Sequence, residues 1–261
     1  EYRDAGAPLL PGLVPAVGEH LSPGGTAVML GNWEHHRGRD WREQVRAWLP
    51  DDLDAWVIQR EGQDPVEYAA MWLRDGGVSP ERDETAFNAR LGSWIDDFAA
   101  RDIEGIGLGY LILHRPASDD GRREPWRILE EVGAAPSGPL GEHVAQVVAV
   151  RSRLAAMSDD EVAALHPVVA PDVTQERHLR PGASDPTLIL IRQGGGFGRA
   201  VRADTALAAL VDVADGELSV AQIASAVSAL MGLPGADAEA LRADLVAAAR
   251  ALAGDGFLML P

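Results

Sequence analysis

The sequence predicts an α/β fold for the first half of the chain and a smaller α+β domain for the second. Short continuous apolar runs alternate with helical patterns in the first half, and a hairpin pattern followed by three helical patterns fills the second. The chain has 261 residues, enough for two domains that each bury a core. We expect domains at 1–116 and 140–261, joined by a linker at 117–139.

The first domain begins with a helix and a strand. Residues 8–21 form an amphipathic, helix-compatible run. Thr26–Leu30 is continuously apolar, which is typical of a strand buried on both faces of a parallel sheet, and Gly31-Asn32 should end it. Asp40 can then cap a helix over 41–49.

The next elements continue the alternation. The stretch 54–59 predicts a second buried strand, and Asp64 can cap a helix over 65–75. A longer helix is expected over 84–101, and a strand of glycines and β-formers over 106–114 closes the domain.

The second domain opens with helices and returns to strands. Residues 141–157 are helical, and Ser158–Glu161 resembles the capped start of a short helix. Strands at 187–192 and 198–202 flank a glycine-rich hairpin loop. Three helices and a strand end the chain, at 204–214, 219–231, 237–253 and 256–260. A helix-turn-helix followed by a strand predicts a winged-helix-like domain.

The charge excludes several classes of partner. Against 40 acidic residues stand 23 basic ones, all of them Arg, so the net charge is −17. Such a surface repels phosphate backbones and anionic membranes, and the helix at 219–231 carries no charge for entering a DNA groove. We therefore expect no DNA partner and favour protein packing or partner binding for the winged-helix-like domain.

Other absences narrow the possibilities further. The chain has no cysteine, which excludes disulfides, thiolate nucleophiles and Cys-type metal sites. No apolar run approaches the ~20 residues of a membrane span, and we expect a cytoplasmic protein. The start, Glu1–Asp4, has neither an initiator Met nor a signal-peptide pattern, so we expect a piece whose upstream part is missing.

Three motifs have simple structural explanations. Gly105–Gly109 matches a GxGxG cofactor loop, but it should lie in a strand and not open a helix, so a glycine-bearing strand is favoured. Gly194–Gly196 precedes no GK[ST] and is favoured as a hairpin turn. Glu34–His36 lacks a histidine partner at helical spacing, and we expect no metal site.

Trp33 is the one tryptophan whose position points to a ligand. It lies just past the carboxyl end of the strand at 26–30, and open α/β sheets bind ligands beyond such ends.

A family resemblance rests on three strings of residues. Leu21–Glu34, Asp54–Glu61 and Asp64–Tyr68 resemble the carboxy-terminal half of an actinobacterial class I S-adenosylmethionine-dependent methyltransferase. That group is related to HemK-like glutamine N5-methyltransferases and to small-domain RNA methyltransferases that carry an Asn-Pro-Pro-Phe/Tyr motif.

The resemblance implies a role for each part of the chain. Thr26–Leu30 would be the fifth strand of a Rossmann-like methyltransferase sheet, Asp54–Gln59 the sixth and Ile106–His114 the antiparallel seventh. Residues 62–104 would form a helical insertion between the last two. The tail, 140–261, would be the group's accessory domain, a likeness carried by Val168–His178 and Leu190–Gly196.

The cofactor-binding motifs of that family are absent from these residues. The glycine-rich loop after strand one, the acidic residue for the ribose and the Asn-Pro-Pro-Phe/Tyr motif are missing, so we expect no cofactor-binding residue in this chain. Catalytic residues stay unassigned. The chain would supply part of the substrate-side wall, with Asn32-Trp33-Glu34 foremost. The candidate substrate-binding residues are Tyr2, Arg3, Asn32, Trp33, Glu34, Arg60 and Glu61.

The implied activity is N-methylation of a protein glutamine, a nucleobase or a small molecule. The acidic surface favours a protein or small-molecule substrate, and RNA stays open. The alternative is a non-enzymatic interaction module that binds an Arg- or Lys-rich partner through that acidic surface.

Overall fold

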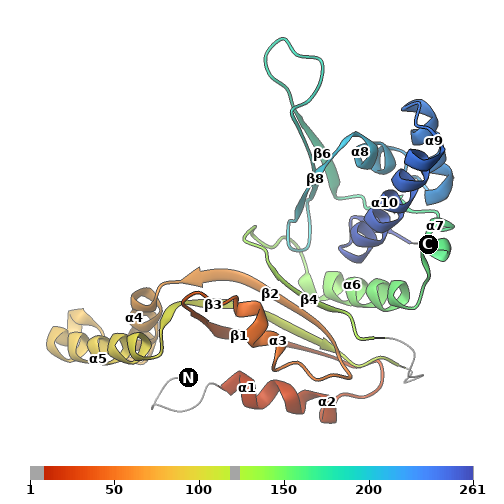
Figure 1. Cartoon of the computed structure of the whole chain (residues 1–261). Coiled ribbons are helices and arrows are strands. Elements are labelled where there is room, and N and C mark those ends of the chain that lie inside the picture. The colour runs from red at the N-terminus through yellow and green to blue at the C-terminus, as the bar shows by residue number, and fades with distance from the viewer. Residues whose placement is uncertain (1–8, 118–123, 261) are drawn as a thin grey trace. The chain divides into compact units, whose positions relative to one another are not determined.

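The computed structural model describes residues 9–117 and 124–260. The chain divides into two compact units, Glu1–Gly133 and Ala134–Pro261, and each mixes helices with strands (Figure 1). The expected α/β class is confirmed at this level. None of the described helices is long and apolar enough to cross a lipid bilayer.

The first unit is built on a four-stranded mixed sheet with the strand order β1-β3-β2-β4. Its strands are β1 (Thr26–His36), β2 (Asp54–Gln63), β3 (Ile103–His114) and β4 (Arg127–Glu131). β3 is antiparallel to both β1 and β2, and β4 is parallel to β2. β1 and β2 therefore run in the same direction with β3 between them.

β4 lies inside the stretch 117–139, which the sequence predicts to be a linker. The half-buried Ile128 and the buried Leu129 supply its apolar side chains, and it adds a parallel strand beside β2. The first compact unit accordingly extends to Gly133 and does not end at Pro116.

One group of helices packs on a face of this sheet and a second group packs on the start of β3. They are α1 (Leu9–Leu13), the short 3-10 helix η1 (Val14–Ala16), α2 (Val17–His20), α3 (Trp41–Arg46), α4 (Pro65–Asp75) and α5 (Pro80–Ala100). The expected helix over 8–21 is divided because Pro15 stands in its middle, at the start of the 3-10 turn. α5 changes direction at Asp83, whose backbone is not helical.

The predicted helix caps are confirmed. The Asp40 carboxylate accepts the backbone N–H of Arg42 at 2.9 Å, and α3 follows. Asp64 accepts the N–H groups of Val66 and Glu67 at 2.8 and 2.9 Å, and α4 begins at the predicted residue.

β1 is longer than predicted. Gly31 and Asn32, which were expected to end it, lie inside a strand that continues to His36. The reason is its partner: β3 pairs with it along nearly its whole length, with Gly31 opposite Gly109.

β1 is also an edge strand, so the prediction of burial on both faces is wrong for it. Ala27 and Met29 pack on the core, but Val28 is 55% exposed and Leu30 77% exposed on the opposite face. The prediction holds for β2, an inner strand whose residues 54–59 are all buried.

The core of the first unit consists of two clusters. One lies between α1–α3 and the sheet and consists mainly of Leu10, Val14, Trp33, Trp41, Val45, Leu49, Leu53, Val57 and Leu111. The other joins the α4–α5 pair to the start of β3 and contains Tyr68, Ala69, Phe98, Ile103 and Ile106.

Two glycines of β3 let neighbouring groups approach its backbone. A Cβ at Gly107 would lie 2.1 Å from Gln59 Oε1, and a Cβ at Gly109 would lie 1.9 Å from the Ile58 carbonyl oxygen. Real Cβ contacts are not that short, so only glycine fits. The glycine-bearing strand favoured for Gly105–Gly109 is confirmed.

The second unit combines a three-stranded antiparallel sheet, β6-β7-β8, with a two-stranded pair, β5-β9. Its strands are β5 (Val168–Val169), β6 (Val173–His178), β7 (Leu188–Gln193), β8 (Ala200–Ala203) and β9 (Leu258–Met259). Its helices are α6 (Leu140–Ala155), α7 (Asp159–Ala163), α8 (Thr205–Asp212), α9 (Val220–Leu230) and α10 (Gly235–Gly254). The predicted β7–β8 hairpin and the capping box at Ser158 are confirmed.

The glycine-rich loop of that hairpin packs against residues of the second unit itself. The N–H groups of Gly194 and Gly195 donate to the Asp172 backbone and carboxylate oxygens, each at 2.8 Å. Gly196 has a φ of +57°, and a Cβ there would lie 2.6 Å from the His143 ring. The loop is a packed turn, as favoured from the sequence.

The glycines of β3 predict a sharp contrast between two alanine substitutions. Gly109→Ala should cost about 3 kcal/mol or more of unfolding free energy, because its methyl group would overlap the β2 backbone. Gly105→Ala is the matched control: its methyl group would lie 3.4 Å from the nearest atom and should change stability by less than about 1 kcal/mol. Urea unfolding monitored by circular dichroism measures both, and equal effects would contradict the packing argument.

His143 predicts a pH dependence of stability. Burial, followed by the nearby charge of Arg199, lowers the pKa of His143 below 6.5. The unfolded chain thus takes up the proton first. The neutral His143 therefore costs the folded state nothing above about pH 6.5. As the pH falls from there toward the folded-state pKa of His143, the free energy of unfolding decreases by less than about 1.4 kcal/mol per pH unit.

Urea unfolding between about pH 5 and 8 tests this expectation. His143→Gln should flatten the slope of stability against pH in that range. A slope unaffected by His143→Gln would show that the imidazole does not contribute.

Candidate functional site

Two candidate residues from different strands lie at the same level of the first sheet. Asn32 on β1 and Glu61 on β2 both pair with Leu108 of β3, one from each side. Two strand spacings separate them, about 10 Å. Because β1 and β2 are parallel, their carboxyl ends lie at the same end of the sheet. The candidate substrate-binding residues that the structure describes lie at these two strand ends.

Trp33 points to the face opposite Asn32 and is 1% exposed. Its indole Nε1 donates to Gln59 Oε1 at 2.8 Å, and the same oxygen lies 2.7 Å from His35 Nε2. Its ring stacks on Trp41, with 5.1 Å between ring centroids. Because Trp33 is buried, a ligand in solvent cannot reach its side chain, and Trp33 belongs to the core of the first unit.

Glu34 shares the face of Asn32 but is held in an ion pair. Its side chain is 5% exposed, and its carboxylate accepts from the Arg101 guanidinium just after α5. Arg101 also binds Asp97 at 2.7 Å. Burial opposes the charge of Arg101, but the hydrogen bonds that its guanidinium donates to Asp97 and Glu34 outweigh burial, and the pKa of Arg101 is raised. Glu34 therefore joins β1 to the end of α5.

Arg60 and Glu61 differ in their availability. Arg60 lies where the pairing of β2 shifts, and its guanidinium donates to the Val132 carbonyl. Glu61 is exposed and accepts from Gln63 Nε2 at 3.0 Å. Of this pair, Glu61 is the side chain that can meet a ligand. Tyr2 and Arg3 lie outside the described residues.

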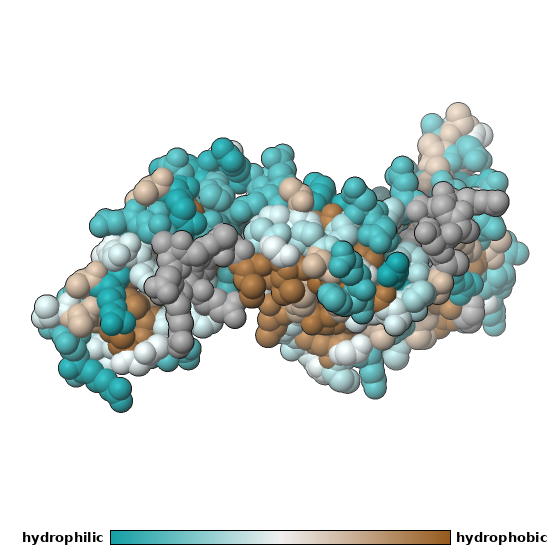
Figure 2. Space-filling model, turned by 90° about the horizontal axis from the view of Figure 1, so that it is seen from below, coloured by the Kyte–Doolittle hydropathy of each residue, from teal (hydrophilic) through white to brown (hydrophobic). Residues whose placement is uncertain are grey.

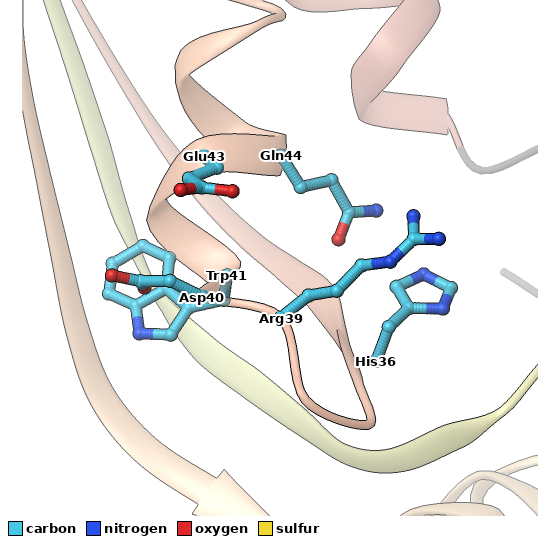
Figure 3. A pocket seen from close by; sticks show the side chains of 6 residues that line it. All are labelled: His36, Arg39, Asp40, Trp41, Glu43 and Gln44. Atoms are coloured by element: carbon cyan, nitrogen blue, oxygen red, sulfur yellow. The ribbon is translucent and has the colours of Figure 1, made fainter.

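A shallow pocket of about 270 Å³ lies immediately after β1, where the chain turns into α3. Its lining residues are His36, Arg39, Asp40, Trp41, Glu43 and Gln44 (Figure 3). Figure 3 shows the Arg39 side chain extending alongside His36, with Gln44 reaching toward them from α3. Asp40 and Trp41 lie on the other side.

Two residues that line the pocket form hydrogen bonds with residues outside it. His36 Nδ1 lies 3.1 Å from the Arg101 carbonyl oxygen, and Trp41 Nε1 donates to Glu131 at 2.8 Å. The hydrogen bond from the Arg42 backbone holds the pKa of Asp40 below its usual range, so this carboxylate stays charged. The sequence predicts that the strand ends at Gly31-Asn32, so it does not indicate His36 as a pocket residue, and the Asp40 cap is its one signal near this pocket.

These residues can bind a polar ligand, but they include no activated nucleophile. The pocket offers a guanidinium, an imidazole, an amide and two carboxylates, a set that recognises groups with both donors and acceptors. Within the described part of the chain, no cluster of three or more His, Asp or Glu side chains could hold a metal ion.

The glycine motifs offer no cradle for a nucleotide-like cofactor. Gly107 and Gly109 lie inside β3 against Gln59 and the β2 backbone, and Gly196 lies against His143. A phosphate or adenosyl loop needs free backbone amides that open a helix. The residues of these two motifs therefore do not fit S-adenosylmethionine.

The hydrogen bond between Trp33 and Gln59 predicts an energetic coupling. Gln59→Leu should cost about 1–3 kcal/mol, because the buried indole N–H loses its acceptor. In a Trp33→Phe background the same substitution should cost less, by about 1 kcal/mol, because the donor is already gone. Urea unfolding of the four proteins measures the coupling, and additive effects would contradict it.

Comparison with known proteins adds no assignment to this site. No family model and no curated protein matches the chain.

Proposed function

We propose that this chain is the substrate-side part of an S-adenosylmethionine-dependent N-methyltransferase. The supporting observation is the order of three strands. The resemblance makes β1 the fifth, β2 the sixth and β3 the antiparallel seventh strand, and in the structure these three are adjacent, with β3 antiparallel to both neighbours.

The helices between β2 and β3 agree with the same proposal. The resemblance expects a helical insertion over 62–104, and α4 and α5 occupy this stretch. They pack on the start of β3 through Tyr68 and Phe98. Glu34 and Arg101 then connect the insertion to β1, next to the proposed substrate wall.

Within this proposal the chain's own residues bind and orient the methyl acceptor. The Asn32 amide can donate and accept a hydrogen bond, and the Glu61 carboxylate can accept one, so together they can fix a planar nitrogen-bearing group. Their contribution to rate is proximity and orientation. The cofactor-binding residues would belong to polypeptide outside the described residues.

The charge of the chain favours a protein or small-molecule acceptor, and RNA is the less favoured substrate. A net charge of −17 opposes the approach of a phosphate backbone. We propose that the second unit is a winged-helix-like accessory domain. Its helix α9 carries no charged residue and consists mostly of small and apolar residues. Such a helix suits protein packing better than nucleic-acid binding.

A second function is favoured by a different observation. The described glycine motifs fit no cofactor, and β1 leaves Val28 and Leu30 exposed at a sheet edge. In this alternative the chain is a non-enzymatic module that binds a protein partner.

Isothermal calorimetry with S-adenosylmethionine distinguishes the two functions. The intact protein, including any segment that precedes residue 1, should bind the cofactor with a dissociation constant of about 1 μM to 1 mM, in the usual range for enzyme ligands. Absence of heat in this range would contradict the methyltransferase proposal and favour the interaction module.

A matched pair of variants then tests the substrate wall in the intact protein. Asn32→Ala should lower methyl transfer at least about tenfold, equivalent to about 1.4 kcal/mol, while cofactor affinity stays unchanged. Asn88→Ala, at an exposed position of α5, should change neither. Equal activities of the two variants would remove Asn32 from the proposed wall.

A further inference from the structure

The arginines of the second unit gather in its three-stranded sheet. Residues 173–203, which form β6, β7, β8 and their connections, contain five of the nine Arg residues of the unit and only two of its fifteen acidic residues. The rest of the unit contains four Arg and thirteen acidic residues. In a chain with a net charge of −17, this sheet is therefore a local region of positive charge.

One face of this sheet is open to solvent, and the strand register defines the residues on it. Leu190 pairs with Glu176 on one side and with Arg202 on the other, so these three side chains share a face. The opposite face carries Ile189 and Ile191, which belong to the core of the unit. Figure 1 shows the β6–β7 hairpin extending away from the helices of this unit. The open face offers Glu176, His178, Leu188, Leu190, Arg192 and Arg202.

The cations of the open face are only partly neutralised. Its one carboxylate, Glu176, accepts from Arg192 Nε at 2.8 Å and lies 3.6 Å from His178 Nε2. Arg202 is exposed and forms no ion pair with any residue that the structure describes, and the same is true of Arg180, just past the end of β6. Arg192 and Arg202 are diagonal neighbours on β7 and β8, about 7–8 Å apart. Two guanidinium groups can thus meet one anionic partner.

Two other arginines of the sheet stabilise the unit itself. Arg177 binds Asp212 of α8 at 3.0 Å, and the buried Arg199 binds Asp255 at 2.8 Å. Arg177 points to the side of β6 opposite Glu176, because successive side chains of a strand alternate. These two charges therefore serve the fold, and the open face is left to Arg192 and Arg202.

The open face also carries apolar side chains beside its cations. Leu188 and Leu190 lie on the central strand β7, on the same face as Arg192, and both are half-buried. A partner that covers these leucines gains about 25 cal/mol for each Å² of apolar surface removed from water. A protein segment can supply carboxylates for the arginines and apolar side chains for the leucines together.

A nucleic acid fits this face less well than an acidic protein segment does. The face has no Phe, Tyr or Trp on which unpaired bases could stack. A phosphate backbone has no apolar group to place on Leu188 and Leu190, and it would be repelled by Glu176. The net charge of −17 opposes the approach of a polyanion much more than that of a segment with a few carboxylates.

The first unit has an exposed apolar surface that lacks such charges. Figure 2 shows apolar atoms gathered on the side of this unit that carries α1, where Leu9 and Leu13 are exposed. Neither α1 nor the stretch Thr26–Trp33 of β1 contains a charged residue. Nothing on that surface selects a partner, whereas the open face of the β6–β7–β8 sheet combines apolar contact with charge complementarity.

We propose that the open face of the β6–β7–β8 sheet is a docking surface for an acidic protein segment that also carries apolar side chains. The carboxylates of the segment bind Arg192 and Arg202, and its apolar side chains cover Leu188 and Leu190. Such a partner has the opposite charge to an Arg- or Lys-rich partner of the acidic surface. The docking surface does not depend on methyl transfer, so it stands or falls separately from the proposed function.

Fluorescence anisotropy with two labelled peptides tests the docking surface on the 261-residue chain. One peptide repeats the triplet Glu-Leu-Ser four times and the other repeats Gln-Leu-Ser, so the two differ only in charge. The Glu peptide should bind with a dissociation constant of about 10 μM to 1 mM, and the Gln peptide at least about tenfold more weakly. Added salt should weaken binding of the Glu peptide, because it screens the exposed charges. No binding of the Glu peptide at about 1 mM would overturn the proposal.

A matched pair of variants separates the surface from the overall charge. Arg202→Gln and Arg242→Gln each remove one positive charge from the second unit, so they change the net charge of the chain equally. Arg242 lies on α10, and its side chain is 38% exposed. Arg202→Gln should weaken binding of the Glu peptide at least about fivefold, and Arg242→Gln less than about twofold. Equal effects would show that only the net charge acts, which would overturn the proposal.

Leu190→Gln tests the apolar part of the surface without changing any charge. It should weaken binding of the Glu peptide at least about threefold, because the contact with the peptide's leucines is lost. Circular dichroism checks that each variant is folded. Unchanged binding by folded Leu190→Gln would remove the apolar contact and overturn the proposal as stated.

Two further measurements exclude other occupants of the same face. An RNA duplex of about 20 base pairs should bind more weakly than the Glu peptide. Tighter binding of the duplex that is lost in Arg202→Gln would show a surface for phosphate backbones and overturn the proposal. Sedimentation should show no self-association that depends on Arg202. Association of the chain with itself that Arg202→Gln abolishes would show that a second copy covers the face, which would also overturn it.

Discussion

The first unit depends on the close approach of three strands around β3. The Trp33 indole and the Gln59 amide meet directly above the β3 backbone, and the space for them exists because residue 107 is a glycine. That hydrogen bond satisfies two polar groups that are buried together. The pairing of β1 and β2 with β3 aligns the two strands and brings Asn32 and Glu61 to opposite sides of Leu108.

Acidic side chains have different roles in the interior and on the surface. Glu34 is buried and paired with Arg101, so its charge serves a structural contact. Glu131 accepts from the Trp41 indole and pairs with Arg42 at 3.1 Å, which joins α3 to β4. In the second unit Asp255 binds the buried Arg199 at 2.8 Å. The net charge of −17 gives the surface a strong negative field, which bears on the choice of partners.

The candidate site could be predicted in part. Sequence position suggested the ends of β1 and β2, and the register brings Asn32 and Glu61 of these two strands together. The directions of the side chains beyond Leu30 could not be predicted, because Gly31-Asn32 predict the end of the strand there. Once the strand continues to His36, alternation sends Trp33 into the core and leaves Asn32 and Glu34 on the other face. The pocket beside Asp40 depends on that same continuation.

The local elements could be predicted from the sequence: the capped helices at Asp40 and Asp64, the buried strand at 54–59, the β7–β8 hairpin and the α/β class. Each depends on nearby residues through capping, periodicity or turn chemistry. Contacts distant in the chain place β4 in the sheet, leave β1 at its edge and put β3 between two parallel strands. Strand order and pairing are contacts between residues far apart in the chain, and the apolar pattern of one strand does not specify its neighbours.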